Sequence, residues 1–255
     1  MCLYEDLKNR VALVTGASSG IGKATAIALA ASGAKVVVNF LKNERGAADT
    51  LATIQKMGGE AWVVKANVSR AEGCRSLIEW LERKVGAADI LVNNAGSLIE
   101  RLGVLEMTEE RWDEVQNVNL KSAYLCTQAV IPAMISRKQG AIVNIVSVAG
   151  RNGGGFGVSH YAAAKAGLIA FSKNVARELA PKGIRVNCVS PGFIDTPFHE
   201  QFSTAEIKKA LLASIPMGRA GMSEEVAQVV AFLCSSASSY VCGETVEVNG
   251  GLLML

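Results

Sequence analysis

Short apolar runs alternate with longer segments of helical periodicity, and this alternation limits the fold more than any other feature of the sequence. Residues 10–15 read RVALVT, an apolar run that ends in a glycine turn and predicts a buried parallel strand. The segment IGKATAIALAASG follows with helical spacing and ends at Gly33, a residue suited to a helix C-terminus. Alternation of this kind predicts βαβ units with right-handed crossovers and helices on both faces of a mostly parallel sheet.

The alternation continues along the whole chain. Further strands are expected at AKVVVNF, EAWVVKANV, ADILVNNAG, GAIVNIVSVAG, IRVNCVSPG and ETVEVNGG. Helices are expected at about 44–57, 70–84, 108–137, 159–179 and 223–234, with Pro132 able to kink the long third one. We therefore predict a single α/β domain over residues 1–255, a doubly wound Rossmann-type fold with about seven parallel strands. A helical excursion at about 196–222, with a turn at Pro216, is predicted to form a lid.

Composition and charge exclude several classes of function. The net charge is only +3 without a block of basic residues, so neither nucleic acid nor an anionic membrane is expected as a partner. No apolar run is long enough to span a membrane, and the acidic first turn, MCLYEDLKNR, does not resemble a secretory signal. The six cysteines lack CxxC spacing and only two histidines occur, which favours reduced thiols in a cytoplasmic protein and no metal site.

The turn after the first strand is rich in glycine. It reads TGASSGIG, with Gly16, Gly20 and Gly22 between a strand and a helix. Glycines at such a place allow a tight turn and let backbone N–H groups approach a pyrophosphate at the helix N-terminus. The spacing is GxxxGxG rather than GxGxxG, and a turn that is merely tight is the alternative.

A second constellation is the pair Tyr161 and Lys165 within SHYAAAKAG. Alanine favours a helix, and side chains four residues apart share one helix face. An ammonium about 5 Å away, in an effective dielectric of about 20, favours the phenolate by about 3 kcal/mol. The pair thus predicts a tyrosine pKa lowered by about two units. A surface pair on an alanine-rich helix is the alternative.

These motifs, in this order, resemble the short-chain dehydrogenase/reductase family. The resemblance also rests on NNAG at 93–96, VNL at 118–120, SVAG with Ser147, RVNCVSPG, PGFIDT and the closing VNGG, and it covers nearly the whole chain. Within the family the chain looks most like 3-oxoacyl-acyl-carrier-protein reductases and glucose 1-dehydrogenases. The resemblance implies an oxidoreductase that transfers a hydride between NADP(H) and a carbonyl or secondary alcohol.

The resemblance also implies a catalytic set of Asn119, Ser147, Tyr161 and Lys165. Tyr161 would be the general acid in reduction, and Lys165 would tune it and bind the nicotinamide ribose. Ser147 would donate to the substrate oxygen, and Asn119 would hold a water that links Lys165 to solvent. Taken alone, Ser147 could cap a loop and Asn119 could be a packed core residue.

The implied cofactor site runs along one edge of the sheet. Its residues are Gly16, Ser18, Ser19, Gly20, Ile21, Gly22, Asn39, Phe40, Leu41, Lys42, Asn67, Val68, Asn94, Ala95, Gly96, Tyr161, Lys165, Pro191, Gly192, Ile194 and Thr196. Small residues at 94–96 leave room for the cofactor, although a turn built for its own sake is the alternative. Thr196 suits either a nicotinamide clamp or a helix N-cap.

Cofactor preference depends on the end of the second strand. An acid there would bind the ribose 2′-OH and repel a 2′-phosphate. The chain instead has Asn39, Phe40, Leu41 and Lys42, and no acid before Glu44. Lys42, and also Arg45, could pair with a 2′-phosphate, to which Ser18 and Asn39 could donate. NADP(H) is therefore favoured, while NAD(H) stays open because Ser19 replaces the family's usual arginine; a solvated surface is the alternative for Lys42 and Arg45.

Two departures from the family pattern stand out. Asn67 replaces the usual aspartate that meets the adenine amino group, so the acceptor there is uncharged. Asn249 begins NGG where DGG is usual, a change expected to affect packing more than chemistry.

The substrate is not named by any residue. Segments 97–101, 151–159 and 198–215 are expected to wall the pocket, with apolar character from Phe156, Phe193, Phe198 and Phe202. Acyl thioesters, sugars and simple ketones or alcohols stay open, so a sugar or alcohol dehydrogenase is the alternative enzyme and a non-catalytic nucleotide sensor a third possibility. The resemblance also implies a homotetramer packed through the helices at 108–137 and 159–179.

Overall fold

The computed structural model of the protein describes residues 4–255, so Cys2 lies outside the described residues. Its seven strands form one parallel sheet in the order β3-β2-β1-β4-β5-β6-β7, which confirms the predicted doubly wound α/β fold. The strands are β1 (Val11–Val14), β2 (Lys35–Phe40), β3 (Ala61–Lys65), β4 (Ile90–Asn93), β5 (Gly140–Ile145), β6 (Ile184–Pro191) and β7 (Thr245–Val248).

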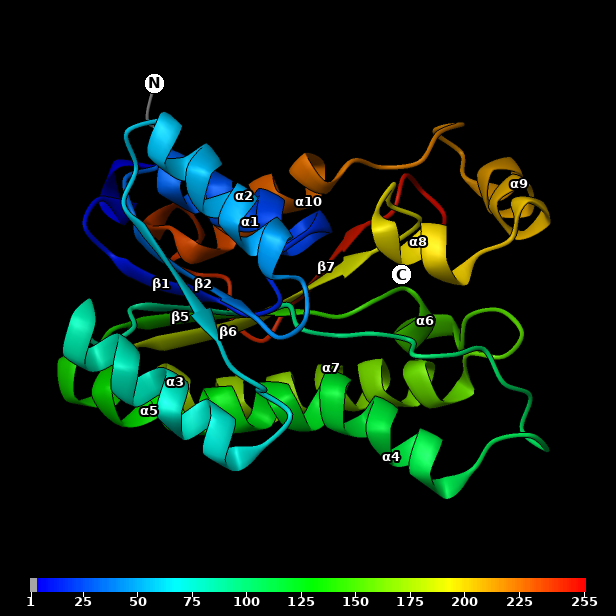
Figure 1. Ribbon diagram of the computed structural model, residues 1–255, viewed down its shortest axis with the longest axis horizontal. Helices are drawn as coiled ribbons and strands as arrows, with labels where there is room; N and C mark the ends of the chain where they lie inside the picture. The colour runs from blue at the N-terminus through cyan, green and yellow to red at the C-terminus, as the bar shows by residue number, and fades with distance from the viewer. Residues whose placement is uncertain (1–3) are drawn as a thin grey trace.

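Helices cover both faces of the sheet (Figure 1). One face carries α1 (Gly20–Ala31), α2 (Glu44–Lys56) and α10 (Ser223–Cys234). The other carries α3 (Ala71–Lys84), α4 (Glu109–Gln116), α5 (Ser122–Arg137) and α7 (Ser159–Leu179). Each face buries its own apolar cluster, because both sides of a strand in a parallel sheet are covered.

The order of the strands determines where a ligand can bind. The sheet runs outward from β1 toward β3 on one side and from β4 toward β7 on the other, so the direction of winding reverses between β1 and β4. In open α/β sheets a crevice opens at this reversal, outside the carboxyl ends of the strands. The glycine turn after β1 and the NNAG segment after β4 both lie at this point.

The long helix expected at 108–137 differs from the prediction. It begins as α4, passes through a π-helical turn at Asn117–Lys121 and continues as α5, which contains Pro132. The periodicity of the sequence, read as one continuous helix, does not show the π turn. Such turns occur frequently at functional sites, and this one contains Asn119.

The excursion expected at 196–222 contains two short helices, α8 (Pro197–Phe202) and α9 (Ala205–Ser214). The chain leaves and rejoins the body at a bridge between Ile194 and Gly221, and neither helix contains a fully buried residue. In Figure 1 the two helices stand at one end of the molecule, beyond the carboxyl ends of the strands. Within residues 4–255, no helix is both long and apolar enough to cross a membrane.

Candidate active site

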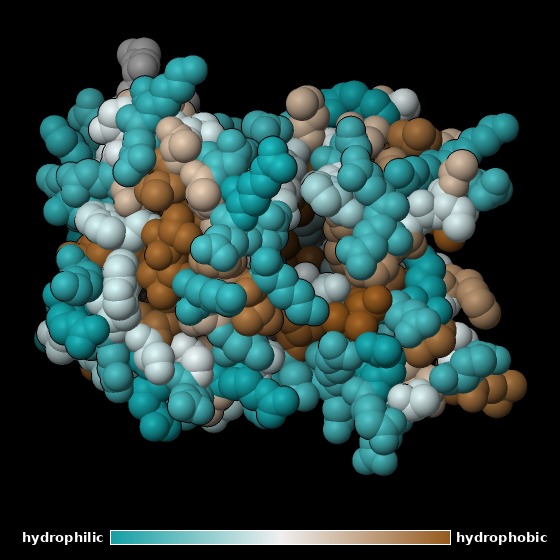
Figure 2. All heavy atoms as spheres, in the orientation of Figure 1, coloured by the Kyte–Doolittle hydropathy of each residue, from teal (hydrophilic) through white to brown (hydrophobic). Residues whose placement is uncertain are grey.

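A cavity of about 270 Å³ lies at the carboxyl ends of the strands. Figure 2 shows a hollow in the middle of one face, between the α1–α2 side and the α8–α9 side, with apolar side chains around it. Thirteen of the predicted site residues line the cavity: Gly16, Ser19, Gly20, Ile21, Asn94, Gly96, Ser147, Tyr161, Lys165, Pro191, Gly192, Ile194 and Thr196. The topology thus brings together residues that are far apart in the sequence.

The glycine turn is held closely against the segment after β4. Gly16 has φ of 62°, and a Cβ there would lie 2.9 Å from the Cα of Ala95. A Cβ on Gly22 would overlap Nδ2 of Asn94, which donates to the carbonyls of Thr15 and Gly16. The turn therefore requires glycine at these two positions. Ser19 precedes α1 without a side-chain capping bond, so the first N–H groups of the helix face the cavity.

The amide of Asn119 is fixed behind the cavity wall. Its Nδ2 donates to the carbonyls of Ser97 and Val115, and its Oδ1 accepts from the backbone N–H of Ser97. A Cβ on Gly96 would lie 2.7 Å from this Oδ1 and 3.2 Å from Nζ of Lys165. Gly96 thus allows Asn119 and Lys165 to approach the same point from different helices. The water relay predicted for Asn119 stays a prediction.

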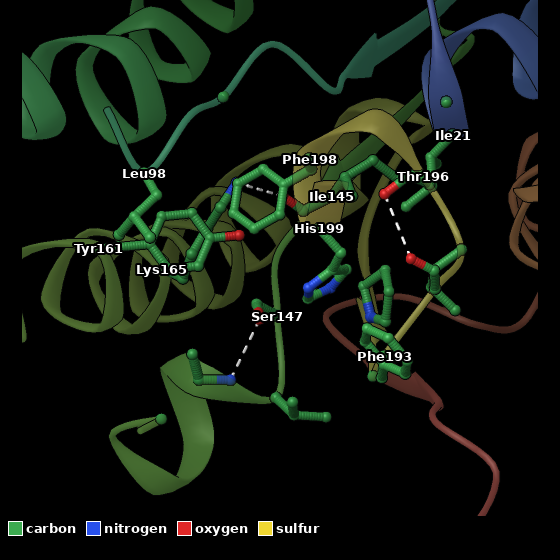
Figure 3. A pocket seen from close by; sticks show the side chains of 18 of the residues that line it. Ile21, Leu98, Ile145, Ser147, Tyr161, Lys165, Phe193, Thr196, Phe198 and His199 are labelled. Atoms are coloured by element: carbon green, nitrogen blue, oxygen red, sulfur yellow. Dashed lines mark hydrogen bonds between the residues drawn. The ribbon is translucent and has the colours of Figure 1, made fainter. Parts of the chain in front are cut away.

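Three polar side chains meet on the cavity floor (Figure 3). Nζ of Lys165 lies 5.6 Å from the ring centroid of Tyr161 and donates to the carbonyl of Ile145 at 2.8 Å. Oγ of Ser147 accepts from the N–H of Ala149, and its hydroxyl also interacts with the phenol of Tyr161. Lys165 is almost fully buried. Figure 3 shows that the side chains of Ser147 and Tyr161 lie at the same cavity.

Burial changes the pKa of Tyr161 in the opposite direction from the one predicted. It raises the pKa of Tyr161 to about 12, and a hydrogen bond with Ser147 only partly opposes this change. Burial also lowers the pKa of Lys165 to about 8. The prediction of a lowered phenol pKa treated the ammonium as fully charged and neglected the cost of desolvating the phenolate. In this structure that cost is the larger effect, so Tyr161 is a protonated phenol at neutral pH.

The excursion supplies an aromatic wall. The ring of Phe198 lies 5.8 Å from that of Tyr161, and the ring of His199 lies 4.6 Å from that of Phe193. Burial lowers the pKa of His199 to about 4, and the nearby charges of Arg101 and Lys208 contribute to this shift. His199 is therefore neutral at neutral pH, and this side of the cavity is mainly apolar.

The remaining predicted cofactor residues do not line the cavity. Asn39 is buried, and its Nδ2 donates to the carbonyls of Val64 and Ala66, so the structure does not favour it as a donor to a 2′-phosphate. Oδ1 of Asn67 already accepts from the N–H and hydroxyl of Ser69. Phe40 and Val68 are buried, whereas Leu41 and Lys42 are exposed at the end of β2. Ser18, Gly22 and Ala95 lie beside the cavity in the turns described above.

Thr15 has no role in the sequence prediction, and Leu98 enters it only as part of segment 97–101, which is expected to wall the pocket. Oγ1 of Thr15 accepts from the N–H groups of Asn94 and Ala95, which joins the turn after β1 to the segment after β4. Leu98 is buried and presents its side chain to the cavity opposite Phe198 (Figure 3). A buried threonine at the end of a strand was the available signal for Thr15.

The hydrogen bonds of Thr196 and Asn249 bear on two expectations from the sequence, a helix N-cap at Thr196 and a packing role for Asn249. Thr196 immediately precedes α8, but its hydroxyl donates to the carbonyl of Ile194 and makes no capping bond. Asn249 donates to the carbonyl of Leu253 and accepts from the N–H of Gly251, which is a packing role. Within residues 4–255, no cluster of three or more His, Cys, Asp or Glu side chains could hold a metal ion.

The fold and the site together define an oxidoreductase that uses a nicotinamide cofactor. The close approach of Gly16 and Gly22 to their neighbours leaves a smooth cradle at the start of α1, and Tyr161, Ser147 and the buried Lys165 lie farther along the same cavity. A cradle of this kind suits a pyrophosphate, and the polar set suits the exchange of a proton with an alcohol or carbonyl.

Comparison with known proteins agrees with this class. The family described as "Enoyl-(Acyl carrier protein) reductase" matches residues 16–253, and the chain belongs to this family of short-chain dehydrogenases/reductases. The chain is 47% identical over 249 residues to a 3-oxoacyl-[acyl-carrier-protein] reductase of Synechocystis, covering 97% of this chain and 98% of that protein. Reductases of the same description from Thermotoga maritima and Staphylococcus epidermidis are 43% and 40% identical, over 97% and 96% of this chain and 99% and 100% of theirs.

Proposed function

We propose that the protein reduces the 3-oxo group of an acyl thioester, with NADPH as the hydride donor. The observation that carries this proposal is the meeting of Tyr161, Ser147 and Lys165 at one end of a cavity that begins at the glycine cradle. The three relatives, which are 3-oxoacyl-[acyl-carrier-protein] reductases and align over nearly their whole lengths, support the choice of substrate.

Each polar group has a separate task in this proposal. The bound reduced nicotinamide would supply the hydride to the carbonyl carbon. Ser147 donates a hydrogen bond to the carbonyl oxygen and holds it beside Tyr161. The phenol of Tyr161 transfers its proton to that oxygen as negative charge develops there. The ammonium of Lys165 stabilises the resulting phenolate, and Phe198 excludes water from one side of the ring.

The preference for NADPH rests on the end of β2. Lys42 is exposed directly after the strand, and no carboxylate occurs there before Glu44, which starts α2. Asn43 is engaged in capping α2 through the N–H of Gly46. With Asn39 turned inward, Lys42 is the strongest candidate for binding a 2′-phosphate, and Ser18 is a second one.

A comparison of substrates tests the proposal. Purified protein is assayed with NADPH and acetoacetyl-coenzyme A, with NADPH and crotonyl-coenzyme A, and with NADP⁺ and glucose. We expect turnover of acetoacetyl-coenzyme A alone. Turnover of crotonyl-coenzyme A alone would indicate the carbon–carbon double-bond reduction in the family's description, and glucose oxidation alone would indicate a sugar dehydrogenase. Turnover of none of these would contradict the proposal.

We further propose that the protein acts in the cytoplasm as a homotetramer. Trp112 on α4 and Tyr124 on α5 are large and partly exposed, and the ring of Tyr124 packs edge-on against Phe171 of α7. An aromatic surface on these helices suits an isologous contact between two copies.

A further inference from the structure

The charges that line the cavity are unbalanced. Arg101 and Lys165 line it, but no aspartate or glutamate does. Lys165 lies on the floor, where the carbonyl of Ile145 accepts from its Nζ. Arg101 lies in the segment after β4, opposite the excursion. The catalytic arrangement described above explains Lys165 and gives no reason for Arg101.

Arg101 donates hydrogen bonds to two backbone amide carbonyls. Its Nε donates to the carbonyl of Phe202 at 2.6 Å, and its Nη1 donates to the carbonyl of Phe156 at 2.7 Å. Both acceptors are amide carbonyls, one at the end of α8 and one in the glycine-rich segment 153–157. The guanidinium therefore stands between two walls of the cavity. Neither bond uses its Nη2 group, which can donate two more hydrogen bonds.

Arg101 forms no ion pair with a carboxylate of residues 4–255. Its side chain is half-buried, and burial lowers the pKa of the guanidinium. Each further hydrogen-bond acceptor stabilises a partly desolvated cation, because the hydrogen bonds that the cation donates replace its lost hydration.

We propose that Arg101 binds an amide carbonyl oxygen in the arm that carries the acyl thioester. The inference rests on the proposed function, since a sugar or a simple alcohol has no such arm. The reacting carbonyl lies between Ser147 and Tyr161, and the arm leaves the cavity between segment 153–157 and α8. Arg101 joins these two walls, so its Nη2 meets the arm on its way out. Arg101 thereby selects thioesters of amide-bearing thiols over simple 3-oxo esters.

Two substrates with the same reacting group separate this role from a structural one. Acetoacetyl-N-acetylcysteamine carries an amide next to the thioester, whereas ethyl acetoacetate carries none. The kcat/KM values of both are measured with NADPH for the wild type, Arg101→Met and Arg101→Lys. Lys208→Met is the control, because it removes a positive charge from α9 without changing the cavity lining.

We expect Arg101→Met to lower the ratio of thioester to ester kcat/KM by about tenfold or more, the effect of one lost charge-assisted hydrogen bond, mainly through KM. Arg101→Lys should recover part of the ratio, and Lys208→Met should leave it unchanged. If Arg101 only holds the two walls together, kcat/KM falls by the same factor for both substrates. The ratio then stays at the wild-type value, which would overturn the inference. A wild type that reduces the ester but not the thioester, or neither, would overturn the proposed function itself.

Discussion

At the scale of single residues, the chemistry depends on burial as much as on identity. Tyr161 and Lys165 are placed side by side by their spacing on α7, as their sequence separation predicts. An attraction between the two charges would lower the pKa of the tyrosine and raise that of the lysine. Both pKa values shift the other way, because desolvation penalises the phenolate and the ammonium. The phenol is thereby kept as a proton donor, and the lysine becomes the group that titrates near neutral pH.

This arrangement predicts an alkaline limb in the pH profile of reduction. The phenol of Tyr161, with a pKa of about 12, stays protonated, whereas Lys165, with a pKa of about 8, loses its ammonium as the pH rises through that value. We expect kcat/KM to be constant below about pH 7 and to fall above about pH 8. Arg at position 165 keeps its charge at these pH values. A limb that stays at the same pH in an active Lys165→Arg variant would contradict the assignment.

The exposed Lys42 gives a second prediction at this scale. Lys42→Gln should raise KM for NADPH by about tenfold, because a charge-assisted bond to the 2′-phosphate is lost. KM for NADH should change little. Lys56→Gln, at the opposite end of α2 from Lys42, serves as the matched control. If Lys42→Gln changes KM for NADPH and for NADH by the same factor, Lys42 does not bind the 2′-phosphate.

At the scale of elements, the site depends on one irregular turn and one glycine. The π turn at 117–121 presents Asn119 to segment 96–97, and Gly96 leaves the space that Asn119 and Lys165 share. Strands and regular helices could be predicted because periodicity of burial is written directly in the sequence. The π turn could not, because nothing in the residue types of NVNLK marks a widened turn.

Gly96→Ala tests this shared space. The added Cβ would lie well inside contact distance of Oδ1 of Asn119, so either this amide or Lys165 must move. We expect kcat to fall by about tenfold to a hundredfold, as for a small displacement of catalytic groups. Gly155→Ala is the control: Gly155 also lines the cavity, but a Cβ there meets nothing within 4 Å. Equal activities of the two variants would show that the space at Gly96 is not needed.

At the scale of the whole molecule, the topology explains why distant motifs form one site. Parallel strands place all their carboxyl ends on one edge, so the motifs after β1, β4, β5 and β6 converge. This convergence could be predicted from the order of strands and helices alone. The inward turn of Asn39 and the position of Arg101 between two walls could not, since both depend on contacts between segments far apart in the sequence.

The proposed tetramer is tested through its aromatic surface. Tyr124→Glu places a charge on a residue that is 41% exposed beside Phe171, and burial of that charge in an interface would be costly. We expect light scattering to give a tetramer for the wild type and a smaller species for the variant. Met57→Glu, at the end of α2, should leave the mass unchanged. A variant that keeps the wild-type mass would place the interface elsewhere.

Tyr161 is proposed to donate the proton to the carbonyl oxygen. The most direct measurement is the rate of NADPH oxidation with acetoacetyl-coenzyme A for the wild type and Tyr161→Phe, with NADPH binding measured separately for both proteins. We predict turnover by the wild type and a loss of about a hundredfold to ten-thousandfold in kcat for the variant, which should still bind NADPH. A variant that binds NADPH and reduces the thioester at the wild-type rate would contradict the account.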